Sequence, residues 1–345
     1  MTTALTPTRA PGSESEHDPD RVVEATLDEV TEAAAAIARS VSGVIEGKPD
    51  VIRLSTVVLL AGGHLLVEDV PGVGKTMLAK SLARSVDCSM RRIQFTPDLM
   101  PSDVTGVSVF NQQTRDFEFR PGGIFANVVL GDEINRASPK TQSALLEAME
   151  ESQVSVDGHT YPLSPPFMVI ATQNPVEMEG TYPLPEAQRD RFMVQTAIGY
   201  PSGSDEVAMI DTQAGESSLA DQRPVTSAAD VARYMRFVRH LHVADTVKAY
   251  VVDLVAATRR SPELRLGASP RATIHLVRAA RARAAVEGRD YVVPDDVQAL
   301  AVPVLAHRLL LTAEAQIGRR TAAEVISDLV RMTPVPGPDM ARPSR

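Results

Sequence analysis

The sequence predicts an α/β fold in which an open parallel sheet lies between helices, carries two β-hairpin inserts and is followed by an all-helical domain. Between residues 51 and 199, apolar strand-like runs alternate with helical patterns, which is typical of a parallel sheet covered on both faces. Several of these runs end in polar residues suited to phosphate chemistry. From about residue 227 onward, almost every segment has helical periodicity.

The first expected element is an amphipathic helix over about residues 20–45. The stretch is too short to indicate a coiled coil, so we expect the helix to pack on the core. Residues 1–20 are rich in Thr, Pro, Ser and acidic residues and are expected to form a disordered tail. The apolar positions of the helix recur at helical spacing, at Leu27, Val30, Ala34, Ile37, Val41 and Val44.

The apolar run Leu65–Val67 leads into a glycine-rich turn and the start of a helix, an arrangement that binds nucleotide phosphates. The glycines let the backbone approach a ligand closely, and the helix N-terminus offers unpaired N–H groups to phosphate oxygens. Lys75 can reach the β- and γ-phosphates, and the Thr76 hydroxyl can ligate Mg²⁺. The residues expected to bind ATP are Val70, Pro71, Gly72, Val73, Gly74, Lys75, Thr76 and Met77.

A second apolar run, Val128–Leu130, ends in the acidic pair Asp132 and Glu133. Ligands of open α/β sheets bind at the carboxyl ends of the strands, so this pair is expected beside the phosphate loop. Asp132 can hold Mg²⁺, and Glu133 can orient the attacking water. The alternative is a solvated turn, which the position directly after a strand disfavours.

A third apolar run, Phe167–Thr172, ends near Asn174. A polar amide at that strand tip could donate a hydrogen bond to the γ-phosphate or to the attacking water. The alternative is that Asn174 only starts a turn, helped by Pro175. We favour the functional interpretation because the strand tip is where the site is expected.

The rest of the chain divides into recognisable segments. Residues 107–119 and 153–161 are expected to form hairpins, the second around Asp157-Gly158. Helix starts are indicated at Ser138, Ser227, Pro294 and Thr321. The expected organisation is a tail over 1–20, a nucleotide-binding core over 21–205, a linker over 206–225, a helical lid over 226–333 and a flexible tail over 334–345.

The composition excludes several classes of protein. A net charge of −9 argues against non-specific binding to nucleic acid or to anionic membranes. The single Cys88 excludes an internal disulfide framework and a cysteine-based metal site, and the seven histidines show no ligand spacing. No apolar stretch reaches the roughly 20 residues of a membrane span, and no secretory signal is visible. We expect a soluble, cytoplasmic protein with no membrane insertion.

Two arginines are candidates for contact with phosphate. Arg191 follows the third strand by a short distance, and Arg271 lies in the first turn of an expected lid helix. Arginine suits bidentate phosphate contact, and an arginine supplied by a neighbouring subunit can stabilise transition-state charge. The alternative is that each is an ordinary solvated surface arginine.

Taken together, these motifs resemble the AAA+ ATPases, and specifically the MoxR family. The resemblance covers roughly residues 45–330 and is specific, because long blocks match without interruption. The blocks that carry it are Gln94–Asp103, Asp132–Ala137, Gln142–Glu151, Ala171–Pro175 and Gly267–Arg271.

The resemblance implies a role for each candidate residue. Gly72–Thr76 corresponds to the Walker A loop, Asp132 and Glu133 to Walker B, and Asn174 to sensor 1. Arg191 is similar to the arginine finger and Arg271 to sensor 2. The family assembles as rings, commonly hexamers, and is thought to act as ATP- and Mg²⁺-dependent chaperones on protein clients. Members are often paired with proteins that carry a von Willebrand factor A domain.

The sequence departs from the family pattern at three places. Asp69 stands where the first Walker glycine is usual, a variant that occurs in similar proteins and is compatible with ATP binding. Lys48 stands where glutamine is usual, which leaves the adenine contact open. Arg189 replaces the more usual leucine and competes with Arg191 for the finger role; we favour Arg191 because of its position in Asp190-Arg191-Phe192.

Three other functions fit the sequence less well than a ring-forming ATPase does. A DNA motor predicts basic hairpin tips, whereas these tips are polar and no nucleic acid is expected as a partner. A nucleotide-gated scaffold with little turnover is disfavoured because every catalytic position is filled. A small-molecule kinase is disfavoured because no acceptor pocket can be identified.

Overall fold

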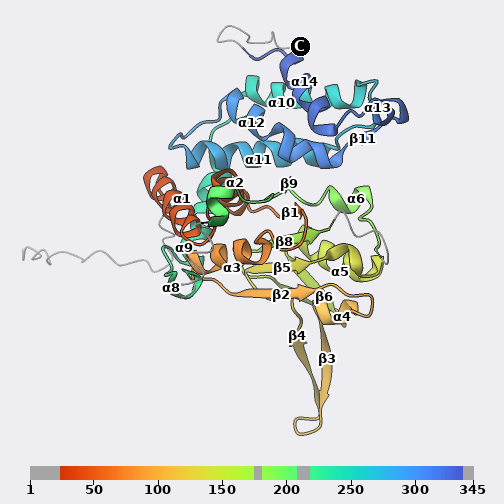
Figure 1. Ribbon diagram of the computed structural model, residues 1–345. Coiled ribbons are helices and arrows are strands. Elements are labelled where there is room, and N and C mark those ends of the chain that lie inside the picture. The colour runs from red at the N-terminus through yellow and green to blue at the C-terminus, as the bar shows by residue number, and fades with distance from the viewer. Residues whose placement is uncertain (1–23, 175–180, 208–217, 337–345) are drawn as a thin grey trace, which may run out of the picture.

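The computed structural model describes residues 24–174, 181–207 and 218–336. The expected tail over residues 1–20 and the end of the expected tail over 334–345 lie outside these ranges. Figure 1 shows a central sheet with helices on both sides, a layer of helices above it and a long hairpin projecting below it. None of the helices in the described ranges is both long and apolar enough to span a membrane.

The central sheet has five strands in the order β2-β5-β8-β1-β9, and every neighbouring pair is parallel. This confirms the parallel sheet expected from the apolar runs. The order places β8 between the strand that leads into the phosphate loop and the strand that ends in the acidic pair. The strands are β1 (Leu65–Glu68), β2 (Met90–Gln94), β5 (Val128–Asp132), β8 (Met168–Gln173) and β9 (Val194–Thr196).

Alternate residues of these strands pack into two separate apolar clusters, one on each face of the sheet. Leu65 and Val67 of β1 pack with the first three helices, whereas Leu66 packs with α5 on the opposite face. Burial on both faces explains why the strands read as continuous apolar runs. The helices of this core are α1 (Leu27–Ser42), α2 (Pro49–Leu60), α3 (Lys75–Ser85), α4 (Pro101–Thr105), α5 (Pro139–Glu151), α6 (Glu186–Arg189) and α8 (Ser218–Asp221).

Helix α1 confirms the expected amphipathic helix but starts later than the sequence indicated. Thr26 is its N-cap and forms a capping box with Glu29, so the helix begins at Leu27. Its buried face includes Val30 and Ile37, which pack into the core. Helix α5 likewise begins directly after its predicted N-cap, Ser138.

Both expected hairpins are present, and an aromatic stack joins them. Phe119 of the first hairpin lies against Tyr161 of the second, with ring centroids 3.9 Å apart and planes inclined by 14°. The first hairpin extends well away from the sheet (Figure 1). The strands are β3 (Gly106–Asn111) and β4 (Asp116–Pro121), followed by β6 (Gln153–Val156) and β7 (His159–Pro162).

The C-terminal part is helical, as expected, and shares one apolar cluster with the core. Helix α11 contacts α1 and α2, so the lid is joined to the core by a packed interface. The expected helix starts at Ser227, Pro294 and Thr321 are all observed. The elements are α9 (Ala228–His240), α10 (Asp245–Arg260), α11 (Pro270–Val286), α12 (Pro294–Leu305), α13 (Ala313–Ile317), α14 (Ala322–Met332) and the short strands β10 (Leu264–Leu266) and β11 (Leu310–Leu311).

The described part of the expected linker is packed against the core. The Gln222 side chain is buried and donates to Ser40 Oγ (2.9 Å) and to the Ser81 carbonyl (3.0 Å). The Val225 N–H donates to the carbonyl of Ser85, the last residue of α3. The polar composition of residues 206–225 indicated a linker. In the structure, the Gln222 amide and the Val225 N–H donate to backbone carbonyls of α3.

Candidate functional site

The phosphate loop connects β1 to α3 in the way the sequence indicated. Gly72 and Gly74 have φ values of 86° and 96°, which favour glycine, and Gly74 caps α3. Lys75 and Thr76 open the helix, so their N–H groups lie at its positive end. Lys75 Nζ donates to the Asp69 carbonyl over 2.8 Å, which holds the ammonium group across the loop.

Asp69 has a structural role that the sequence did not reveal. Its carboxylate accepts hydrogen bonds from the N–H groups of Val70 (2.8 Å), Ile198 (2.7 Å) and Gly199 (2.6 Å). The last two residues follow β9, where the chain leaves the sheet. Asp69 therefore ties the start of the phosphate loop to the segment that leads toward the lid.

Lys48, the second departure from the family pattern, lies beside the same segment. Its Nζ donates to the Tyr200 carbonyl over 2.7 Å, so the side chain links the start of α2 to the chain after β9. A Cβ atom on Gly199 would lie 3.8 Å from Lys48 Nζ. The contact gives Lys48 a structural role next to the phosphate loop.

The acidic pair is held by a threonine of the neighbouring strand. The buried Thr172 hydroxyl donates to Asp132 Oδ1 (2.6 Å) and accepts the Glu133 N–H (2.9 Å). Glu133 has a φ of 56°, an uncommon conformation for a residue other than glycine. Thr172 therefore fixes the backbone turn between Asp132 and Glu133, and this turn points their two carboxylates in different directions.

Two side chains of the edge strand β2 also contact the acidic pair. Arg92 donates to Asp132 Oδ2 from Nε (3.0 Å) and from Nη2 (2.5 Å). Gln94 Nε2 donates to Glu133 Oε2 over 2.7 Å, and Arg92 Nη2 donates to Gln94 Oε1 over 2.6 Å. Sequence reasoning missed Arg92, Gln94 and Thr172, although the i, i+2 spacing of the first two places them on one face of a strand.

Asn174 follows β8 directly and is 5% exposed. Because β8 lies between β1 and β5, this residue lies between the phosphate loop and the acidic pair at the same edge of the sheet. The structure therefore brings together the loop, the acidic pair and Asn174. Pro175, which was considered a turn residue, lies outside the described ranges.

Arg191 and Arg271 meet at a shared carboxylate, Glu150, in the last turn of α5. Arg191 Nε donates to Glu150 Oε2 over 3.0 Å, and Arg271 Nη2 pairs with Glu150 Oε1. The hydrogen bond from Arg191, together with the charge of Arg271, lowers the pKa of Glu150. Both arginine side chains stay partly exposed, at 27% and 33%.

Asp190, next to Arg191, anchors this cluster to the lid. Its carboxylate accepts hydrogen bonds from Ser269 Oγ (2.9 Å), from Arg308 Nε (2.8 Å) and from Arg271 Nη1 (3.5 Å). Arg308 is buried, and this burial lowers its pKa to about 10. Three residues of the lid are therefore fixed to one residue of the core.

The two arginines that competed for the finger role are both partly exposed, but their contacts differ. Arg189 Nε is buried and has no hydrogen-bond partner among the described residues. Arg191, in contrast, donates from its Nε to Glu150. Because accessibility is similar at both positions, the preference for Arg191 stays a prediction, and the carboxylate contact at its Nε supports it.

Oxygen donors suited to Mg²⁺ are present at Thr76 and Asp132. Mg²⁺ in nucleotide sites is held by one or two protein oxygens together with phosphate oxygens and water, so this small donor set fits the ion. Within the described ranges, no group of three or more His, Cys, Asp or Glu residues is placed to hold a metal ion. Any metal bound here would therefore depend on the nucleotide for most of its ligands.

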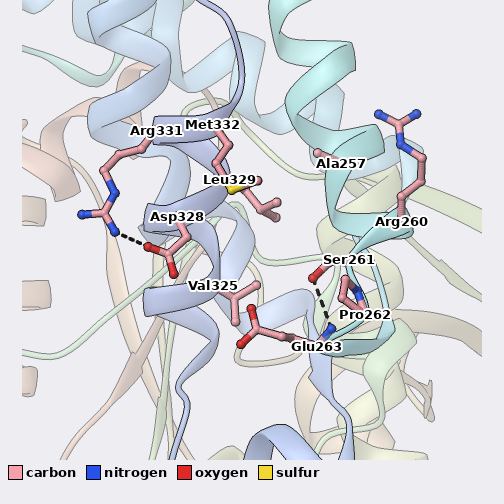
Figure 2. Close-up of a pocket in the computed structure, with 10 residues that line it drawn as sticks. All are labelled: Ala257, Arg260, Ser261, Pro262, Glu263, Val325, Asp328, Leu329, Arg331 and Met332. Carbon is pink, nitrogen blue, oxygen red and sulfur yellow. Dashed lines mark hydrogen bonds and ion pairs between the residues drawn. The ribbon is translucent and has the colours of Figure 1, made fainter.

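A cavity of about 580 Å³ lies elsewhere, between α10 and α14 of the lid. Figure 2 shows that Leu329 and Met332 of α14 face it from one side and Pro262 from the other. Figure 1 places α10 and α14 in the helical layer above the sheet, away from the phosphate loop. This cavity is separate from the nucleotide site.

Comparison with known proteins agrees with this geometry. Residues 64–194 match the "ATPase family associated with various cellular activities (AAA)", and residues 256–329 match the "AAA lid domain". The chain is 51% identical to the protein YeaC of Bacillus subtilis over 86% of this chain and 92% of that one. It is 42% identical to "Chaperone MoxR1" of Mycobacterium tuberculosis over 86% and 80%.

A solved structure has the same fold. The crystal structure of a candidate ATPase from Cytophaga hutchinsonii is 36% identical and superimposes with a TM-score of 0.84, covering 90% of this chain and 97% of that one. The match extends over the sheet and the helical lid together, because so little of either chain is left out.

Proposed function

This chain belongs to the MoxR family of AAA ATPases, and we propose that it assembles into a ring, most simply a hexamer, that uses ATP hydrolysis to remodel client proteins. ATP binding and hydrolysis follow from membership of the family. A protein client is supported by the relative named as a chaperone. We place the protein in the cytoplasm, where ATP is plentiful.

The observation that carries the proposal is the pairing of Arg191 and Arg271 with Glu150. Two guanidinium groups on one carboxylate lie within a few ångströms of each other, so they are placed to act on the same phosphate group. Among the described residues, Arg191 and Arg271 pair with Glu150 and Asp190, and neither forms a hydrogen bond or ion pair with the phosphate loop. We infer that both serve the nucleotide of a neighbouring subunit, which requires assembly.

The roles of the remaining residues follow from their positions. The loop Val70–Gly74 and the start of α3 would hold the phosphates through backbone N–H groups, and Lys75 would neutralise β- and γ-phosphate charge. Thr76 and Asp132 would hold Mg²⁺, which supplies positive charge to the phosphate oxygens.

The hydrolytic step would then depend on residues at the strand ends. Glu133 would orient the attacking water, and Asn174 would donate to that water or to the γ-phosphate. Arg191 and Arg271 of the adjacent subunit would stabilise the charge that develops in the transition state.

The surface of the long hairpin, β3 and β4, favours a polypeptide over DNA as the client. Its tip is polar and carries a single cation, Arg115, whereas Phe110 and Phe117 are exposed on one face with ring centroids 5.4 Å apart. Nucleic-acid binding requires clustered positive charge, which this hairpin lacks. By resemblance to the family, we also propose a partner with a von Willebrand factor A domain.

The proposal is tested by ATP hydrolysis per subunit measured against protein concentration, with light scattering to report assembly. We expect the specific rate to rise with concentration in the native chain and to fall about 10³-fold in Arg191→Ala. A flat rate that the substitution leaves unchanged would show self-sufficient subunits. Stimulation by DNA instead of by a protein client would revive the DNA motor.

A further inference from the structure

Arg92 lies against a carboxylate that is expected to hold Mg²⁺. In the sheet register, Arg92 pairs with Leu130, so its side chain extends along β5 to reach Asp132 two residues further on. Two of its N–H groups, on Nε and Nη2, point at the same oxygen, Asp132 Oδ2. The contact is therefore a directed ion pair, and a chance approach of two surface charges would not produce it.

The two partners of this ion pair differ in their freedom to move. The Asp132 side chain is 12% exposed, and its other oxygen accepts the Thr172 hydroxyl. The Arg92 side chain is 51% exposed and comes from an edge strand, so it can turn into solvent. The carboxylate is fixed, whereas its cationic partner is free to leave.

We propose that Arg92 competes with Mg²⁺ for Asp132 and must leave this carboxylate when the metal–nucleotide complex binds. Two cations close to one carboxylate repel each other, and a carboxylate oxygen that accepts two N–H groups is poorly available to a hydrated metal ion. Arg92 is thus a positioning residue that holds Asp132 in place until the metal arrives. The inference rests on the proposed Mg²⁺ site and is independent of ring assembly.

The same side chain links Asp132 to the residue expected to orient water. Arg92 Nη2 donates to Gln94 Oε1, which turns the amide so that Nε2 donates to Glu133 Oε2. When Arg92 leaves Asp132, Gln94 loses the donor that fixes its amide. Metal binding at Asp132 would in this way loosen one of the two side-chain contacts of Glu133 Oε2, the other being the ion pair with Arg136 Nη1 (3.3 Å).

The test is the coupling between Mg²⁺ and nucleotide, measured by binding. For the full chain, the Kd of a fluorescent ADP is determined in EDTA and in excess Mg²⁺. The Kd in EDTA divided by the Kd in Mg²⁺ is then compared between variants. In Arg92→Gln we expect the ratio to rise about two- to fivefold, the range for a partly exposed ion pair, with the Kd in EDTA unchanged. Arg92→Lys keeps the charge but not the paired Nε and Nη2 donors, so its ratio should lie between the native value and that of Arg92→Gln.

The matched control is Arg91→Gln, which removes the same charge from the adjacent exposed residue of β2. It should leave the ratio unchanged. A ratio in Arg92→Gln that stays at or below the native value would overturn the proposal. A higher Kd in EDTA for Arg92→Gln would also overturn it, because it would show that Arg92 contacts the nucleotide phosphates. A native ratio near one would show that the Mg²⁺ site itself is wrong, whereas the ring would be unaffected.

Discussion

Arg191 Nε donates to Glu150 Oε2 over 3.0 Å, and this contact orients the part of the guanidinium that faces outward. A carboxylate bound at Nε leaves the two terminal nitrogens as a fork, the geometry suited to bidentate phosphate contact. Arg271 pairs with the other oxygen of the same carboxylate. Glu150 therefore sets the relative position of both arginines.

We accordingly expect Glu150→Gln to lower turnover by about ten- to a hundredfold, because misplaced catalytic groups lose much of their effect. Glu151→Gln is the control, since Glu151 is the exposed neighbour at the end of the same helix. Steady-state hydrolysis at saturating ATP and high protein concentration measures the difference. Equal rates in the two variants would leave Glu150 without a role in positioning the arginines.

Glu133→Gln should separate binding from hydrolysis. The amide keeps the size of the side chain but cannot polarise water as a carboxylate does, so turnover should fall by about 10²–10⁴-fold. The Kd for ATP should stay within about twofold of the native value, because the phosphates are held by the loop and Lys75. A variant that still hydrolyses ATP at the native rate would refute the role given to Glu133.

Asp69 should matter for both stability and nucleotide affinity. Replacement by Ala removes the acceptor for the Ile198 and Gly199 N–H groups, so we expect a loss of about 1–3 kcal/mol in the free energy of unfolding and weaker ADP binding. Asp69→Asn keeps one acceptor oxygen and should lose less. Chemical denaturation measures the free energy of unfolding, and nucleotide titration measures the affinity. If Asp69→Ala were as stable as the native chain, the hydrogen bonds from Ile198 and Gly199 would not be needed to hold the loop.

His64 predicts a dependence of stability on pH. Its Nδ1 accepts the Val169 N–H (3.0 Å) and its Nε2 lies 3.0 Å from the Met149 carbonyl, so the buried ring is held neutral. Burial lowers its pKa from 6.5 to about 4. The unfolded chain therefore binds a proton between pH 6.5 and 4 that the folded chain does not.

The free energy of unfolding should consequently fall as the pH falls through this range, by up to about 1.4 kcal/mol per pH unit for this residue. Denaturation at pH 7, 6 and 5 measures the slope. His64→Leu should be less stable at pH 7 but should show a shallower slope. An identical slope in the two proteins would mean that His64 does not titrate in this way.

Much of the fold could be predicted from local patterns. The strands that end at Asp132 and near Asn174 were found because burial on both faces gives continuous apolar runs, and the helix starts were found because caps have a sequence signature. The contacts of Arg92, Gln94 and Thr172 could not be found in this way. The contacts Arg92–Asp132 and Thr172–Asp132 each join neighbouring strands at positions 40 residues apart in the sequence. No local sequence pattern specifies which strands are neighbours.

Glu150 was missed for a related reason. It lies within a block that identified the family, but its partners Arg191 and Arg271 come from segments 41 and 121 residues away. The packing of the lid on the core, through Asp190 and Arg308, brings these segments together. Only the three-dimensional structure shows that the two arginines share one carboxylate.

The central claim, that active sites are completed between subunits, is tested most directly by mixing two inactive variants. Lys75→Ala removes the phosphate-binding ammonium group but keeps Arg191, whereas Arg191→Ala keeps the phosphate loop. If Arg191 acts on the neighbouring nucleotide, mixed rings contain interfaces with both groups intact, so the mixture should hydrolyse ATP although each variant alone does not. A mixture that stays as inactive as its components, under conditions where light scattering shows mixed assembly, would contradict the account.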